Sequence, residues 1–249
     1  MVEKINILNH DVYENGNTHD NEDIYYFTYD SDGRVTSYYT EDSEDGIYRV
    51  TYENNTIVID FEGEESYTER STFTLGEDGY VTNFTSVEND RFTTTGTLTY
   101  ADGYVREGRL TTSESDEERI DRAVWENGNL VKVESLIPYM DNTAAEISYD
   151  NPNYVNNPKI NLDLNYLIGH SEWLECFMFG GLYLQPFGYI GQRSALYMTE
   201  ERDLYDGSYY TYTYQFDELG RPVEIHKVCH TNDPYYVSEE YTYTITYKE

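Results

Sequence analysis

The sequence predicts an all-β protein in which antiparallel strands follow one another up and down and curl into a barrel or half-barrel. Three observations lead to this prediction. A bulky residue followed by a polar turn recurs about every 24 residues. Apolar and Thr-rich positions alternate along each expected strand, and the repeat is interrupted once, between Val155 and Thr199. A repeat that encodes one hairpin per unit indicates an architecture but names no function.

Each repeated unit ends on a bulky residue directly before its turn. Seven residues hold this place: Tyr29, Tyr52, Leu75, Tyr100, Trp125, Tyr149 and Phe216. The turns that follow are rich in Asp, Asn and Gly, the residues of tight hairpins, and their glycines include Gly33, Gly79, Gly103, Gly128 and Gly220. Seven turns with two strands each predict about 14 strands.

The strands are expected to have one buried face. Another apolar side chain, such as Phe27, Val50 or Phe73, lies two residues before each pre-turn residue, and the residue between is often Thr. A period of two places these sets on opposite faces, which suits an antiparallel sheet with one wet side. The pre-turn aromatic residues then form a belt near the tight-turn end, made of Tyr29, Tyr52, Tyr100, Trp125 and Tyr149.

Longer acidic connections alternate with the tight turns. They cover residues 41–46, 62–66, 88–91, 114–118 and 138–143. In an up-and-down meander these connections share one end, so an acidic rim is expected there. Weak capture of a cation would involve Glu41, Asp42, Glu44 and Asp45, although a solvated charge cluster explains these side chains better.

The interruption at residues 155–199 is interpreted as an insertion within one β domain that covers residues 1–249. Helix and strand patterns compete over residues 160–168, and Ser171 then looks like the N-cap of a short helix at about 171–179. Trp173 and Phe177 fall on its apolar stripe. Eight strands already suffice for a filled barrel, so a wider one needs a plug. We therefore expect the insertion to pack against the concave aromatic face.

Composition limits the classes of molecule that the protein is expected to bind. A net charge of −32 argues against nucleic acid and against anionic membrane surfaces, since both attract Lys and Arg. Glycans, cations and basic protein surfaces stay open as partners, a monomer is expected, and no cofactor is predicted. Cys176 and Cys229 match no zinc or redox spacing, and free buried thiols explain them better than a disulfide.

Catalytic and metal motifs are weak. His226 and His230 would lie about 13 Å apart on a strand, too far to share an ion. Asp30, Asp32 and Gly33 resemble part of a calcium loop, but hairpin chemistry explains them fully. No nucleophile elbow or phosphate loop is present, and a carboxylate pair carries no specificity among 48 Asp and Glu residues. No catalytic residue is predicted.

Two local resemblances stand out. Residues 25–36 and 212–223 resemble the Tyr-Asp repeat of bacterial wall-associated and toxin-shell proteins. The chain as a whole resembles a lipoprotein family of unknown function from gut bacteria that has a porin-like β fold. The segments at 160–167 and 190–194 carry that likeness. The resemblance implies an exported, lipid-anchored precursor in the cell envelope, and it transfers no catalytic residue.

These observations favour a non-enzymatic, exported cell-envelope domain for binding or adhesion. A glycan-binding β platform is one alternative, since aromatic side chains on a sheet can stack on sugar rings. A transmembrane porin-like barrel is another, because porins also have tight turns at one end and longer loops at the other. A hydrolase is the weakest alternative. The first 24 residues contain no apolar run of the signal-peptide type, so the expected location follows from the resemblance alone.

Overall fold

A computed structural model describes residues 1–40, 46–63, 67–137, 143–169, 187–231 and 236–248. Sixteen strands and one helix lie in these ranges. They are β1 (Val2–Tyr13), β2 (Thr18–Tyr29), β3 (Val35–Thr40), β4 (Ile47–Glu53), β5 (Thr56–Glu62), β6 (Thr68–Leu75), β7 (Val81–Glu88), β8 (Phe92–Ala101), β9 (Tyr104–Thr112), β10 (Ser115–Glu126), β11 (Asn129–Leu136), β12 (Thr143–Ser148), α1 (Leu164–Ile168), β13 (Glu200–Asp203), β14 (Tyr209–Phe216), β15 (Pro222–His230) and β16 (Tyr236–Tyr247).

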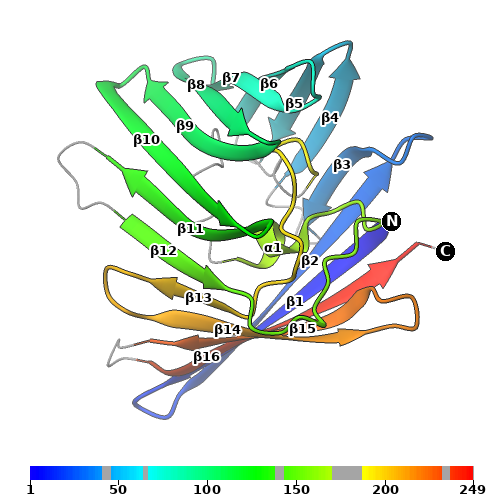
Figure 1. The fold of residues 1–249 in the computed structure, drawn as a ribbon, viewed down its shortest axis with the longest axis vertical. Helices are drawn as coiled ribbons and strands as arrows, with labels where there is room; N and C mark the ends of the chain where they lie inside the picture. The colour runs from blue at the N-terminus through cyan, green and yellow to red at the C-terminus, as the bar shows by residue number, and fades with distance from the viewer. Residues whose placement is uncertain (41–45, 64–66, 138–142, 170–186, 232–235, 249) are drawn as a thin grey trace.

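The strands form a closed antiparallel barrel in which every strand pairs with its neighbours in sequence (Figure 1). Closure comes from β1 and β16, which pair from Val2 opposite Tyr247 to Tyr13 opposite Tyr236. The prediction of an all-β antiparallel meander is thus confirmed. Because the order contains no crossover, all connections of one kind leave from the same end of the barrel.

The predicted count of about 14 strands is too low by two. Seven pre-turn positions account for the fourteen strands from β2 to β15, and the strands that close the barrel, β1 and β16, fall outside that count. The Asn151-Pro152 turn also differs from expectation, because it leads into the insertion rather than into a hairpin. β12 pairs instead with β13, which begins 52 residues after β12 ends, at Glu200 after Ser148.

Local chemistry explains the tight turns. Asp102 and Gly103 have φ of 55° and 79°, and Asn127 and Gly128 have φ of 50° and 77°. Two successive positive values are the signature of a type I′ hairpin, whose twist matches that of its strands and which favours Asn-Gly and Asp-Gly.

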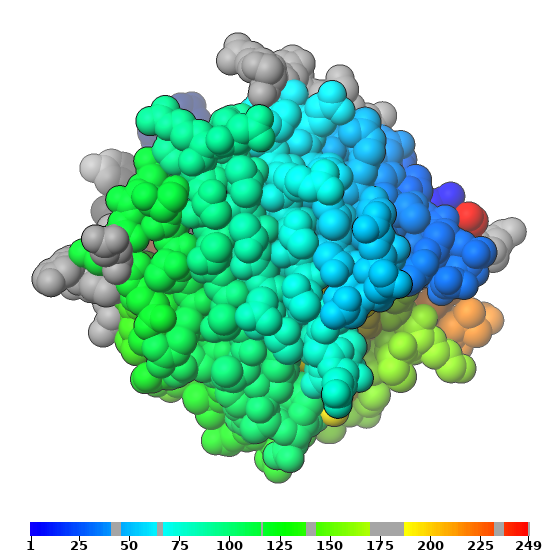
Figure 2. All heavy atoms as spheres, turned by 90° about the horizontal axis from the view of Figure 1, so that it is seen from above, coloured from blue at the N-terminus to red at the C-terminus, as the bar shows by residue number. Residues whose placement is uncertain are grey.

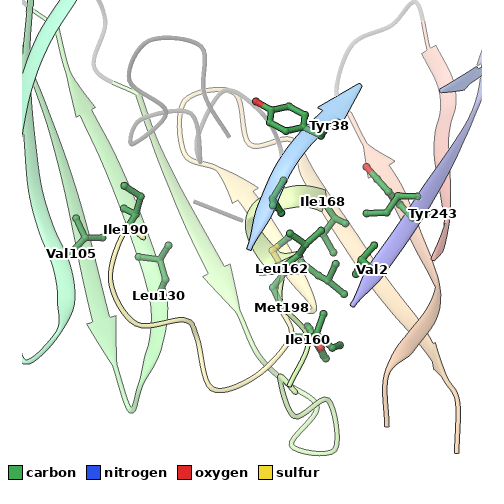
Figure 3. Packing of buried hydrophobic residues seen from close by; sticks show 14 of the residues in the cluster. Val2, Tyr38, Val105, Leu130, Ile160, Leu162, Ile168, Ile190, Met198 and Tyr243 are labelled. Atoms are coloured by element: carbon green, nitrogen blue, oxygen red, sulfur yellow. The ribbon is translucent and has the colours of Figure 1, made fainter. Parts of the chain in front are cut away.

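The core lies inside the barrel. Alternate strand residues point inward and are buried, among them Ile57 and Ile59 on β5 and Ile225 on β15. Side chains from the insertion join the same cluster. Figure 3 shows Leu162, Ile168 and Met198 between Val2 and Tyr243 on one wall and Val105 and Leu130 on the other.

The described parts of the insertion, residues 155–169 and 187–199, therefore fill the barrel from within, as predicted. Helix α1 lies inside the ring of strands (Figure 1). Asp163 caps it by accepting a hydrogen bond from the backbone N–H of Asn165. The predicted helix at 171–179, with Trp173 and Phe177, lies outside the described residues.

One stretch of the insertion follows the tight-turn end of the wall. The backbone carbonyl of Tyr189 accepts from Val81 N–H, and the N–H groups of Gln192 and Ala195 donate to Gly103 and Gly128. Gly103 is favoured by its positive φ of 79°, and a Cβ there would also displace the end of the Gln192 side chain, which lies 2.5 Å away. These bonds attach the plug to successive hairpins.

The outward face of the wall is polar and charged. Ion pairs join neighbouring strands, such as Arg49 with Glu62 at 3.0 Å and Arg70 with Asp60 at 2.7 Å. Figure 2 shows the first half of the chain as one continuous outer surface. Separately, no helix in the described part of the chain is long and apolar enough to cross a membrane.

Candidate binding site on the inner wall

The predicted aromatic belt lies inside the tight-turn end and is held by hydrogen bonds. The Tyr100 hydroxyl donates to the Val81 carbonyl at 2.6 Å, and the Trp125 indole N–H donates to the Val105 carbonyl at 2.8 Å. In each case the donor ends one strand and the acceptor lies at the start of the preceding strand. The same bond is made by Tyr29 to Val2, Tyr52 to Val35, Tyr149 to Leu130 and Tyr247 to Pro222.

Phe216 holds a pre-turn position, but its side chain has no hydrogen-bond donor. In its strand Tyr214, two residues earlier, donates to the Met198 carbonyl at 2.8 Å, and Phe216 packs against the rings of Tyr154 and Tyr197. Desolvation raises the pKa of belt tyrosines such as Tyr29, to about 12. These hydroxyls therefore stay protonated donors, and the belt ties strands to one another rather than presenting free groups.

The two Tyr-Asp segments have one turn geometry in common. The Asp30 carboxylate accepts from the backbone N–H and side chain of Arg34, and Asp217 does the same for Arg221. Each arginine then lies over a belt ring, Arg34 over Tyr52 at 4.4 Å. These bonds from the arginine backbone N–H lower the pKa of Asp30 and Asp217. Asp30, Asp32 and Gly33 are thus engaged in a turn.

The other candidate residues from the sequence do not come together in one site. Glu41, Asp42, Glu44 and Asp45 lie outside the described residues, as does Cys176. His226 faces outward with Nε2 3.2 Å from Glu240, whereas His230 stacks on Tyr209. Cys229 is a free, buried thiol. Within the described ranges, no group of three or more His, Cys, Asp or Glu side chains could hold a metal ion.

Polar side chains also point inward, above the apolar layer. One such group surrounds Glu69, which is 7 % exposed and accepts hydrogen bonds from Ser71 at 3.1 Å and Ser86 at 2.6 Å. Another pairs the buried Asp121 with Arg119 at 3.0 Å. A third group, which we call the Lys227 cluster, lies on β13–β16 and β1 and consists of Asp11, Glu201, Tyr210, Tyr212, Lys227, Cys229, Glu239 and Tyr241.

Strand register brings the Lys227 cluster together. Lys227 lies opposite Tyr212 on one side and Tyr241 on the other. One rung farther from the tight-turn end, Cys229 lies between Tyr210 and Glu239, and Glu239 lies opposite Asp11 on β1. Residues far apart in the sequence therefore form one continuous patch.

Lys227 is the most unusual member of the cluster. It is 5 % exposed, and its Nζ lies 4.2 Å from the centroid of the Tyr210 ring and 5.0 Å from that of Tyr241. Among the described residues no carboxylate oxygen lies within 4.0 Å of this ammonium and no acceptor hydrogen-bonds to it. The aromatic faces provide cation–π stabilisation, and no side chain or carbonyl of the described residues accepts from its three N–H donors, although the nitrogen is not one of the fully buried atoms that lack a partner.

Two carboxylates of the cluster accept hydrogen bonds from tyrosine hydroxyls. Tyr212 donates to Glu201 at 2.9 Å, and Tyr241 donates to Glu239. Asp11 is 8 % exposed, and its Oδ1 is buried without a hydrogen-bond partner in the described structure. Because Asp11 and Glu239 face each other across β1 and β16, like charges meet there, which is unfavourable.

Burial perturbs the titration of the cluster. Desolvation lowers the pKa of Lys227, opposed by the charges of Glu201 and Glu239. Desolvation, together with Glu239, raises the pKa of Asp11. It also raises the pKa of the Cys229 thiol to about 11, so this thiol is protonated at neutral pH. Converging groups with perturbed pKa values mark a candidate functional site, although structural networks show them too.

Sequence reasoning did not single out Lys227. A signal was present, because the period of two that places Ile225 and Cys229 on the inner face also places Lys227 there. A lysine in the buried phase of a strand is rare unless it is paired. Glu201 had no comparable signal, since its strand has only four residues.

Comparisons with known proteins agree on the fold. The family model described as "Domain of unknown function (DUF4595) with porin-like fold" matches residues 27–224. No curated protein matches the chain.

Two solved structures are similar over almost their whole length. A crystal structure of a porin-like protein from Bacteroides uniformis ATCC 8492 has a TM-score of 0.71 and 17 % identity, covering 99 % of this chain and 96 % of the other. One from Bacteroides vulgatus ATCC 8482 has a TM-score of 0.65 and 16 % identity, covering 99 % and 98 %. Such low identity shows a common fold alone.

Proposed function

The chain belongs to the family of domains of unknown function with porin-like fold, and from that premise we propose that it is a non-enzymatic binding domain of the bacterial cell envelope. Its ligand site is the Lys227 cluster on the inner wall. The lipid anchor and the Tyr-Asp repeat remain predictions from resemblance.

One observation carries the binding role: Lys227 is 5 % exposed and has no acceptor among the described residues, and in the same cluster a buried oxygen of Asp11 has no donor. Burying an ammonium or a carboxylate without partners costs stability. An unsatisfied buried group therefore needs an explanation, and a bound ligand that completes its hydrogen bonds is the one proposed here. At Glu69, by contrast, Ser71 and Ser86 supply the hydrogen bonds that the buried carboxylate needs.

The chemistry of the cluster supports binding over catalysis. A nucleophile needs an adjacent base, and the Cys229 thiol has a raised pKa, which makes its reactive thiolate scarce. Tyr210 and Tyr241 likewise have raised pKa values because they are desolvated. These groups bind and orient at neutral pH.

The outer wall supports an aqueous setting. A transmembrane barrel presents an apolar band to lipid and a polar interior. Here the arrangement is reversed, with an apolar core inside and ion pairs such as Arg49 with Glu62 outside. The periplasm or the outside of the cell fits this wall and the net charge of −32.

The binding role is tested by measuring the unfolding midpoint of the chain against a small-molecule panel of sugars, amino acids and nucleosides. A ligand that binds only the folded state raises the midpoint in proportion to the logarithm of its concentration. We expect at least one such compound, recovered chemically unchanged by mass spectrometry. Turnover of the compound would replace the binding role by an enzymatic one.

Location is tested separately by fractionating the native bacterium and treating intact cells with protease. The protein is expected in the envelope fraction. Recovery in the cytosol would contradict export, and palmitate labelling of the native protein tests the anchor.

A further inference from the structure

We propose that the Lys227 cluster binds a neutral saccharide whose oxygens accept hydrogen bonds from Lys227 and whose hydroxyls donate to Asp11. This inference rests on the proposed binding function and names the class of ligand. Three features of the inner wall carry it.

The first feature is a set of hydrogen-bond donors and an acceptor that lack protein partners among the described residues. Lys227 offers three N–H donors, and the described structure holds no acceptor for them. Asp11 offers a buried Oδ1 without a donor. A ligand that satisfies both groups must accept at one place and donate at another, which a hydroxyl group does.

The second feature is the balance of charge. An anionic ligand at Lys227 would lie beside Glu201 and Glu239, whose charges act on the lysine. A cationic ligand at Asp11 would approach the Lys227 ammonium. A neutral polyhydroxyl molecule meets neither repulsion, and it leaves the bonds from Tyr212 to Glu201 and from Tyr241 to Glu239 in place.

The third feature is spacing and access. Lys227 and Asp11 lie two strands and one inward-facing rung apart, about 12 Å between Cα atoms at ordinary strand spacing, and both face the interior. That span suits one or two sugar rings. Tyr210, Glu239 and Tyr241 are only half-buried, so the cluster reaches solvent on the side away from the tight turns.

The Glu69 group provides an internal contrast. It is also an inward-facing buried carboxylate whose pKa is raised by desolvation. Ser71 and Ser86 both donate to it, and the wall around it holds no lysine among the described residues. Burial of a carboxylate alone therefore does not define the site.

The test is calorimetric titration of the full chain with three sets of oligosaccharides. The neutral set derives from glucan, mannan, galactan and xylan, the anionic set contains uronic acids, and the cationic set is chitosan-derived. We expect binding by at least one neutral family, a weakening of tenfold or more in Lys227→Met, and a smaller loss in Asp11→Asn.

Two variants serve as controls, with circular dichroism as the folding check. Lys132→Met removes an outer lysine that pairs with Glu134 at 2.7 Å, and Glu69→Gln neutralises a buried carboxylate outside the Lys227 cluster. Both should bind within twofold of the parent. If Lys227→Met does not fold, Asp11→Asn carries the comparison.

The contrary outcomes are distinct. Binding of only a charged set, lost in Lys227→Met, overturns the neutral-saccharide class and leaves the binding function standing. Binding that Lys227→Met and Asp11→Asn leave unchanged overturns the site. Failure of all three sets overturns the saccharide inference, whereas the proposed function falls only if the wider panel also yields no ligand.

Discussion

Several ionisable side chains of this barrel are buried in its interior. Lys227 sits between two tyrosine rings, and Asp163 caps α1 inside the plug. Both are explained by what surrounds them rather than by their neighbours in sequence. Their titration is therefore the most direct readout of the interior.

Lys227 should titrate below the other lysines, because desolvation penalises its charged form. The measurement is a pH titration of the lysine signals by NMR, with Lys227→Met identifying the resonance. Lys132, on the outer wall, is the reference. A titration of Lys227 at or above that of Lys132 would show that its ammonium is solvated.

Asp163 should make the protein less stable as pH rises. Desolvation raises the pKa of its carboxyl from 3.8 to about 6, so the folded state holds this proton more tightly than the unfolded state. The associated stability is present below about pH 4 and is lost as pH rises through about 6. The loss amounts to about 3 kcal/mol.

Asp163→Asn removes this titration and keeps an oxygen for the Asn165 N–H. The free energy of unfolding of Asp163→Asn, measured with urea, should rise relative to that of the parent between pH 4.5 and 8. Asp217→Asn is the matched control with the opposite sign, because its hydrogen bonds lower the pKa of Asp217. A pH-independent difference for Asp163→Asn would contradict the buried, protonated carboxyl.

At the scale of elements, hairpins are specified locally and cross-linked by the belt. Positive φ at Asp102, Gly103, Asn127 and Gly128 matches the residues found there. The pre-turn aromatic residue then donates to the start of the preceding strand, as Tyr100 does to Val81. A residue recognised by its spacing thus serves both to fill the core and to fasten two strands.

Tyr100→Phe should lower the free energy of unfolding by about 1 kcal/mol, since it keeps the ring and removes one hydrogen bond. Chemical denaturation measures the change. Tyr39→Phe is the control, because the Tyr39 hydroxyl makes no hydrogen bond within the described structure and its ring stacks on Tyr26. Equal effects at the two positions would remove the belt bond as a source of stability.

At the scale of the whole molecule, the polarity of the wall is the reverse of that in a porin, with the apolar side chains inside. Its interior is packed with wall and plug side chains, and its exterior carries cross-strand ion pairs. The insertion makes this possible, because a closed barrel of sixteen strands cannot be filled by wall side chains alone.

The full chain should therefore stay monodisperse without detergent, with the mass of one chain by light scattering. It should remain in the aqueous phase of a detergent partition. A bacterial porin treated in parallel should enter the detergent phase. Loss of the chain to that phase would revive the transmembrane alternative.

Much of the fold could be predicted because its signals are local. Alternation at Phe27, Val50 and Phe73 revealed the buried face, and the spacing of Tyr29, Tyr52 and Tyr100 revealed the hairpins. The site could not be predicted in the same way. Lys227, Glu201 and Asp11 belong to strands that meet only in the closed barrel. Lys227 alone carried a local signal, its place in the buried phase of β15.

The sequence by itself determined which residues turn, which faces are apolar and where the repeat breaks, because turn chemistry and side-chain alternation act within a few residues. Only the tertiary structure decided that β1 meets β16, that residues 155–169 and 187–199 of the insertion pack against the inner wall, and that Lys227 is buried between Tyr210 and Tyr241. Closure and burial depend on contacts between distant segments, whose combined free energy no local pattern records.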